Sequence, residues 1–339
     1  MNKIVTIKTK DQLKLSDFKR GEKHRLYVHL SENALSIPWK VPVIVVRGKK
    51  KGKVLGITAA IHGDELNGIS TIFKLIEEID PEKLTGTLVL VPICNVPGYM
   101  TNKRYFLDNV DLNRIMPGQI NGNASKIYAY HLTQKIISKF DYLLDLHTAS
   151  HGRVNSLYIR ADLDNEETRT LAYLQNPQII VKKYDESGTL RAWTNEQGIP
   201  SITIEIGNPN AFQHSLIDET LEGILNTMRH LNMIDGEVKD HVTDATICDH
   251  SYWLLSTKGG IVDVLPKLTD KVKKGEVVAR VYDVFGTVKE EVIADRNGIV
   301  IGKNVSPNCL AGNRLVHLGV DEIELEPQMI PANDEINIE

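Results

Sequence analysis

Short apolar runs alternate with helical patterns between residues 25 and 235, and this alternation limits the possible folds more than any other feature of the chain. Apolar residues recur every three or four positions, as in amphipathic helices, at residues 66–79, 125–139 and 216–233. The runs expected to form strands are residues 25–30, 41–46, 54–61, 87–93, 142–147, 178–181 and 201–206. Strands that alternate with helices predict an α/β sheet covered by helices on both faces.

A different pattern begins near residue 240. Helical periodicity disappears, and short β-rich runs separated by Gly or Asn follow at residues 261–265, 276–282, 289–294 and 298–302. These runs predict a small β barrel or sandwich. A chain of 339 residues, 42% of them hydrophobic, can bury a large core and is long enough for two domains. We therefore expect a catalytic α/β domain at residues 1–238 and an all-β domain at residues 239–339.

The β-rich segment resembles the barrel-sandwich fold of biotinyl and lipoyl carrier domains in its spacing of glycines and acidic turns. The modified lysine of a carrier would fall near the hairpin Phe285-Gly286-Thr287, where no lysine stands, and Lys289 lies past the turn. We therefore do not expect a carrier role. We expect this module either to cover an active site or to form the contact of a homo-oligomer.

Three of the predicted strands end on residues that commonly bind metals or transfer protons. One is followed by His62 and Glu65, another ends at His147, and a third carries Glu205 between two isoleucines. Ligands of open α/β sheets bind outside the carboxyl ends of the strands. Two histidines and one carboxylate form the ligand set of a hydrolytic zinc site, with one position left for water. We therefore predict that His62, Glu65 and His147 bind one Zn²⁺ ion per chain.

These residues also have ordinary structural explanations. A single histidine at a strand end is more often a hydrogen-bonded loop or core residue than a metal ligand. Glu205 could simply close its strand into a turn, but a buried acid is costly unless it is paired or functional, which favours a role as general base. Asp64 and Asp145 are candidates for orienting a ligand. His151 is expected in a loop, at the pocket or the surface.

Charge and cysteine content argue against several other classes of protein. A net charge of -4 and a pI near 6.3 give no general reason to bind nucleic acid. The first residues lack the apolar core of a signal peptide, and no stretch approaches the roughly 20 apolar residues of a membrane span. We therefore expect a cytoplasmic protein without membrane contact. Three widely separated cysteines, Cys94, Cys248 and Cys309, argue against a disulfide framework.

Four motifs, in a fixed order, carry a family resemblance: His62-Gly-Asp-Glu65, Asp111-Leu-Asn113-Arg114, Asp145-Leu-His147-Thr and Thr203-Ile-Glu205-Ile-Gly207. The segment between about residues 40 and 235 resembles the succinylglutamate desuccinylase and aspartoacylase family, which is related to zinc carboxypeptidases. The resemblance implies a mixed, mostly parallel sheet with helices on both sides. It also implies that His62, Glu65 and His147 are the zinc ligands and that Glu205 is the catalytic carboxylate.

The same resemblance implies roles for four residues that would contact the substrate. Asn113 and Arg114 would recognise a carboxylate, which suits a guanidinium fork beside an amide, although an arginine on a loop is usually a solvated charge. Arg104 would stabilise the developing oxyanion, but the segment from it to Asp111 is longer than in aspartoacylase. Arg191 would bind substrate or, alternatively, lie on a helix surface.

Together these residues predict a zinc-dependent amidohydrolase that removes an acyl group from an N-acyl amino acid or a related small amine. A dication lowers the pKa of bound water to about 7, and Glu205 would take its proton and pass it to the leaving amine. The expected partner is therefore a small-molecule N-acyl substrate. Two alternatives stay open: a carboxypeptidase-like peptidase, and a metal-binding scaffold protein without turnover. The acyl group, the amine and the physiological metal are not determined by the sequence.

Overall fold

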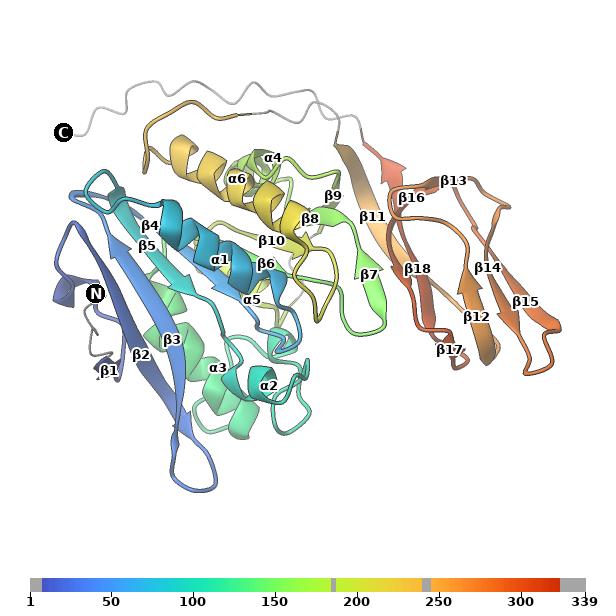
Figure 1. Cartoon of the computed structure of the whole chain (residues 1–339), viewed down its shortest axis with the longest axis horizontal. Coiled ribbons are helices and arrows are strands. Elements are labelled where there is room, and N and C mark those ends of the chain that lie inside the picture. Colours follow the sequence, from blue (N-terminus) through green and yellow to red (C-terminus); the bar gives the residue numbers. More distant parts are fainter. Residues whose placement is uncertain (1–7, 184–186, 240–244, 324–339) are drawn as a thin grey trace.

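One mixed sheet of 14 strands extends through the molecule, as the computed structural model shows for residues 8–183, 187–239 and 245–323 (Figure 1). The strands of its α/β part are β1 (Lys8–Lys10), β2 (Glu22–Glu32), β3 (Pro38–Arg47), β4 (Lys50–Ala59), β5 (Thr85–Val91), β6 (Tyr142–His147), β8 (Leu157–Ala161), β9 (Ile179–Lys182) and β10 (Ser201–Ile206). Their order is β1-β2-β3-β5-β4-β6-β10-β8-β9. Parallel pairs join β5, β4, β6 and β10 at the centre, whereas β8 runs antiparallel to β10. The predicted mixed sheet is confirmed.

Helices cover both faces of this sheet, as predicted (Figure 1). They are α1 (Asn67–Glu78), α2 (Val96–Met100), α3 (Ala124–Lys135), α4 (Glu166–Leu174), α5 (Leu190–Glu196) and α6 (His214–His230), with 3-10 turns at Leu15–Asp17, Leu112–Arg114 and Ile137–Lys139. Leu143 of β6 packs in the core under α3 and α5, and the next residue, Leu144, packs in the core under α1, α4 and α6. Strands buried on both faces read as continuous apolar runs, which is why the sequence revealed them.

Helix α1 packs closely on the sheet just after the first predicted metal-binding motif. Its buried residues Ile69, Ile72 and Leu75 recur every three positions and form its inner face. A Cβ added to Gly68 would lie 2.7 Å from the Cβ of Leu146, so only glycine permits this approach. The start of α1 is thereby held against the end of β6.

The large sheet continues into the C-terminal module, at the right of Figure 1. Its strands there are β11 (Thr246–Leu255), β18 (Arg314–Glu322), β16 (Gly298–Asn304) and β13 (Lys271–Val272), and β7 (Arg153–Asn155) of the α/β part pairs with β16. A second, four-stranded antiparallel sheet contains β15 (Val288–Ile293), β14 (Val277–Tyr282), β12 (Gly260–Val264) and β17 (Asn308–Cys309). The predicted all-β segment is therefore confirmed.

Strand β11 joins the two parts of the chain. It pairs with β9 of the α/β part on one side and with β18 of the module on the other. We retain the division at residues 238 and 239 as a proposal, because it falls between α6 and β11. The three cysteines are free and buried, as expected. None of the described helices combines the length and apolar character needed to span a membrane.

Candidate metal centre and its pocket

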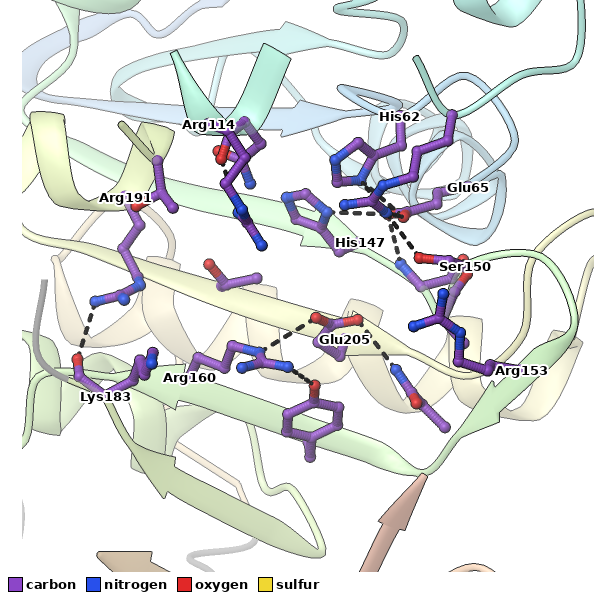
Figure 2. Close-up of a pocket in the computed structure, with 18 of the residues that line it drawn as sticks. His62, Glu65, Arg114, His147, Ser150, Arg153, Arg160, Lys183, Arg191 and Glu205 are labelled. Atoms are coloured by element: carbon purple, nitrogen blue, oxygen red, sulfur yellow. Dashed lines mark hydrogen bonds and ion pairs between the residues drawn. The ribbon is translucent and has the colours of Figure 1, made fainter. Parts of the chain in front are cut away.

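Three residues from distant segments bring possible metal-ligand atoms together. His62, Glu65 and His147 each offer one such atom, and these atoms lie within 4.8 Å of one another. All three side chains are buried. His62 and Glu65 follow β4, and His147 is the last residue of β6, the parallel neighbour of β4. The sheet therefore delivers both segments to one edge, where Figure 2 shows the three residues grouped.

Both imidazole rings lie between two carboxylates. The Nδ1 atoms of His62 and His147 are 2.7 and 2.9 Å from the Glu65 oxygens. The Nε2 atom of His62 is 3.0 Å from Asp111, and that of His147 is 2.9 Å from Asp145. A neutral ring that donates its Nε2 proton to an aspartate keeps a lone pair on Nδ1, which suits a cation beside Glu65. The donor set therefore fits a divalent ion such as zinc.

Asp145 is itself fixed by the sheet. It pairs in register with Thr58 of β4, whose hydroxyl donates to Asp145 Oδ1 over 2.7 Å. Asp145 therefore lies where it can orient His147, the role suggested for it from the sequence. Asp64, the other candidate, has a buried Oδ1 atom that finds no hydrogen-bond partner among the residues the structure describes.

The charges around Glu65 keep it ionised. Burial opposes the charged form, but His62 and His147 outweigh it and hold the pKa of Glu65 well below its usual range. Burial likewise opposes the charge of His147, yet Asp145 and Glu65 raise the pKa of that imidazole well above its usual value. An ionised carboxylate is the form that binds a cation, and a cation that binds Nδ1 of His147 would displace the proton from that atom.

Glu205 lies beside this centre on the neighbouring strand. In the parallel register of β6 and β10, Glu205 is the partner of His147. Its carboxylate is buried and accepts hydrogen bonds from Asn155 over 3.3 Å and from Arg160 over 3.4 Å. Figure 2 shows Glu205 between His147 and Arg160. These hydrogen bonds are to side chains that line the pocket rather than to the turn after β10.

Arg104 bridges two carboxylates at the edge of the centre. Its Nη1 atom donates to Glu65 over 2.9 Å and to the hydroxyl of Ser150 over 2.8 Å, and its Nη2 atom donates to Asp111 over 2.8 Å. The guanidinium also lines the pocket. Its positive charge is thus held next to the candidate metal ligands.

Asn113, Arg114 and Arg191 lie in the same pocket. The side-chain oxygen of Asn113 accepts from the backbone N–H of Leu190 over 2.7 Å, so its amide NH₂ group is the donor left for a ligand. The exposed Arg114 donates only to the backbone oxygen of Asn113 among the described residues. Arg191 is 4% exposed and donates to the backbone oxygen of Lys183. The alternative that Arg191 lies on a helix surface is therefore wrong.

All eight predicted site residues line one cavity of about 150 Å³. The sequence analysis missed several other residues of its wall, namely Arg153, Asn155, Tyr158, Arg160, Trp253 and Arg314. Tyr158 and Arg160 are two positions apart on β8, and this alternation was a signal that could have revealed them. Trp253 and Arg314 come from the C-terminal module and carried no comparable signal. His151 is exposed in a loop, as expected.

The pocket wall is strongly cationic. Six arginines and one lysine line it, against two glutamates. A cavity with such an excess of one charge attracts ligands of the opposite sign. The pocket is therefore suited to an anionic small molecule.

Comparison with known proteins identifies relatives of this chain. Residues 51–231, more than half of its length, match the succinylglutamate desuccinylase/aspartoacylase catalytic domain. The N-alpha-acetyl-L-2,4-diaminobutyric acid deacetylase of Halomonas elongata is 26% identical over 294 residues, which cover 81% of this chain and 84% of the relative.

Solved structures show the same fold. The product-bound ectoine utilization protein EutE (DoeB) from Ruegeria pomeroyi has a TM-score of 0.81 at 22% identity, over 89% of this chain and 97% of that protein. A succinylglutamate desuccinylase/aspartoacylase from Rhodobacter sphaeroides has a TM-score of 0.82 at 21% identity, over 93% of this chain and all of that protein, 100%. The likeness therefore includes the C-terminal module as well as the α/β part.

Proposed function

Since the chain belongs to the succinylglutamate desuccinylase/aspartoacylase family, a family of deacylases, we propose that it is a zinc-dependent amidohydrolase that removes the acyl group from an N-acyl amino acid or a related small amine. One observation carries this proposal. His62, Glu65 and His147 form a buried ligand set, and Glu205 is the partner of His147 on the next strand. This arrangement combines a metal site with an acid that can act as a base.

The size of the pocket supports a small substrate. Its volume of about 150 Å³ is below the roughly 300–1,000 Å³ of pockets for drug-sized ligands. Trp253 and Arg314 of the C-terminal module contribute to its wall. The Halomonas elongata relative acts on an N-acetylated amino acid, which supports the same substrate class here. A peptide would need a longer open groove, so we favour a deacylase over a peptidase.

Each site residue has a role that its position allows. His62, Glu65 and His147 would hold the ion, which when bound supplies Lewis-acid chemistry by lowering the pKa of water to about 7 and polarising a carbonyl. Glu205 takes a proton from the attacking water and delivers it to the nitrogen of the leaving amine. Arg104 donates hydrogen bonds to the carbonyl oxygen as negative charge develops on it.

The remaining residues position the reacting groups. Asn113 and Arg114 hold the carboxylate of the amino-acid part through the amide NH₂ group and the guanidinium fork. Arg191 adds positive charge on the same side of the pocket (Figure 2). Asn155 and Arg160 each bind one oxygen of Glu205, which keeps the carboxylate directed at the scissile bond.

The proposal is tested by screening N-acyl amino acids, N-acyl diamines and N-blocked peptides with the zinc-loaded protein and measuring the release of free amine. The same panel is repeated after metal removal and after addition of zinc, cobalt or manganese. We expect amine release that depends on the metal and is greatest for small N-acyl compounds. Preference for blocked peptides would indicate the peptidase instead. No release from any amide by the zinc-containing protein would support a scaffold without turnover.

A further inference from the structure

Strand β7 is attached to the C-terminal module rather than to the other strands of the α/β part. Within the described part of the chain it pairs with β16 alone, in antiparallel register, and Asn155 lies opposite Gly302. The next residue, Ser156, donates to the backbone oxygen of Ile301 from its own backbone N–H over 2.9 Å and from its hydroxyl over 3.1 Å. The position of residues 153–156 therefore depends on β16.

The same segment of the chain reaches the proposed base. Strand β8 begins directly after Ser156 and pairs with β10, the strand that carries Glu205. The side-chain NH₂ group of Asn155 donates to Oε2 of Glu205 over 3.3 Å, whereas Arg160 of β8 binds Oε1. Figure 1 shows β7 beside the module. Residues 153–161 thus connect the module to the carboxylate of Glu205.

Each oxygen of Glu205 has its own donor. The terminal torsion of a glutamate side chain is broad, so a carboxylate that is held at one oxygen can still rotate. With Arg160 on Oε1 and Asn155 on Oε2, the plane of the carboxylate is fixed. A displacement of about 1 Å in a reacting group can lower the rate about 100-fold. The contact with Asn155 therefore bears on the reaction as well as on the attachment of the module.

Gly302 leaves the space that Asn155 occupies. A Cβ added to Gly302 would lie 2.3 Å from Oδ1 of Asn155 and 3.0 Å from the backbone oxygen of Val154. The first distance is far below van der Waals contact, so the Asn155 amide would have to move. It can do so by rotating, because the terminal torsion of an asparagine is soft, whereas the backbone of β7 is held by its pairing with β16. A side chain at position 302 would thus turn the amide away from Glu205 and leave the strands paired.

We propose that the C-terminal module positions the base of the α/β part, through Gly302 of β16 and Asn155 of β7. Asn155 is in this role a positioning residue that acts on the reaction through Glu205, and Gly302 provides the room for its amide. The inference rests on the proposed function, in which Glu205 is the base, and it adds a task for the module. A module that only covered the pocket would not alter Glu205 when residue 302 changes.

The first test is a double-mutant cycle, measured with the N-acyl amino acid that the zinc-loaded protein hydrolyses best. Gly302→Ala and Asn155→Ala should each lower kcat about 10- to 100-fold, the loss expected for a charge-assisted hydrogen bond, with a smaller change in KM. Asn155→Ala removes the oxygen that a Cβ at position 302 would meet. Gly302→Ala should therefore cause no further loss of kcat in the Asn155→Ala background.

Gly259→Ala is the matched control. Gly259 belongs to the same module, is exposed and has no positive φ, and a Cβ there would lie 3.4 Å from its nearest neighbour, the backbone oxygen of Cys309. This variant should keep the kcat of the natural chain. Unchanged kcat in Gly302→Ala would overturn the proposal. An equal loss from Gly302→Ala with and without the Asn155 side chain would also overturn it.

Urea unfolding and zinc content separate positioning from a general loss of structure. Both quantities should be close to those of the natural chain in Gly302→Ala. If Gly302→Ala is unstable, Asn155→Leu decides, because leucine has nearly the shape of asparagine but cannot donate a hydrogen bond. A normal kcat in Asn155→Leu would overturn the proposal, and a loss like that of Asn155→Ala would support it.

The second test requires no turnover. Crystal structures of the natural chain and of Gly302→Ala should show the Asn155 amide turned away from Glu205 in the variant, with β7 and β16 still paired. An amide that keeps its contact with Glu205 in the variant would overturn the link through Gly302 and leave the deacylase proposal intact. Absence of hydrolysis by the natural chain would instead contradict the proposed function, whatever the crystal structures show.

Discussion

The candidate metal centre and the distal end of the pocket, at Arg153 and Arg314, share one cavity but are held in different ways. At the metal centre, charges meet opposite charges within the chain, as where Glu65 contacts two histidines and Arg104. At the distal end, Arg153 rests on Trp253 and has no carboxylate partner among the described residues. The comparison indicates that contacts within the chain fix His62, Glu65 and His147, whereas the distal end keeps positive charge that an anionic ligand could balance.

The largest effect is expected at the base. Glu205→Gln keeps the shape of the side chain but cannot accept a proton, so kcat should fall about 100- to 10,000-fold. Zinc content, measured by mass spectrometry, should not change, because Glu205 is not among the three clustered ligands. The exposed Glu322→Gln on β18 is the control and should leave kcat unchanged. Near-normal turnover by zinc-containing Glu205→Gln would disprove the mechanism.

The next effect tests how the metal centre is supported. Asp145→Asn weakens the acceptor bound to His147 Nε2 and should lower zinc affinity about 10- to 100-fold, as measured by competition with a coloured chelator. Asp64→Asn is the comparison, because Asp64 is next to Glu65 in the chain, whereas the carboxylates found in contact with the imidazoles belong to Glu65, Asp111 and Asp145. Asp64→Asn should lower the zinc affinity less than Asp145→Asn does. Equal effects of the two variants would show that net charge matters rather than the orientation of His147.

A smaller effect is expected on the free energy of unfolding, through His317, the buried residue whose ring stacks on Trp253. Burial, together with the charges of Arg160 and Arg314, holds the pKa of His317 well below its usual value. Below about pH 6.5 the unfolded chain therefore binds a proton at His317 that the native state does not bind. The contribution of His317 to the free energy of unfolding is complete above that pH and falls as the pH decreases. Between pH 7 and pH 5 the loss should reach about 2 kcal/mol.

Urea unfolding at pH 7 and at pH 5 measures this loss in the free energy of unfolding. His317→Phe keeps an aromatic ring against Trp253 and should lose less stability on acidification than the natural chain. His250→Phe, at an exposed position of β11, is the control and should lose as much stability on acidification as the natural chain. If His317→Phe and the natural chain lose equal stability, His317 is not kept neutral by its surroundings.

The smallest effect is expected at the amine end of the substrate. Arg114→Lys keeps the charge but removes the guanidinium fork, so KM should rise about tenfold with little change in kcat. An N-acyl amine without the carboxylate serves as control substrate and should not distinguish the two proteins. An unchanged KM for the N-acyl amino acid would mean that Arg114 does not bind its carboxylate. The orientation of the substrate in the pocket would then differ from the one proposed.

Strand ends were the part of the site that could be predicted. The strands that carry His147 and Glu205 are buried on both faces, and a polar residue at the end of a continuous apolar run is conspicuous. The Arg160 strand was missed because residues 153–161 mix arginine, asparagine and serine with apolar residues. Its side chains alternate between core and pocket, so its pattern is weaker than that of a fully buried strand.

The sequence by itself determined the most strongly buried strands and the three long helices, and it showed which of those strands end in histidine or glutamate, because burial of a segment leaves a local pattern of apolar residues. Only the tertiary structure decided that Asp145 rather than Asp64 contacts a histidine, that Asp111 supports His62, and that Arg153 meets Trp253. Those contacts depend on the order of strands in the sheet and on the pairing of β7 with β16, which join segments far apart in the chain. No local pattern records such a pairing, since each residue involved would look the same in another neighbourhood.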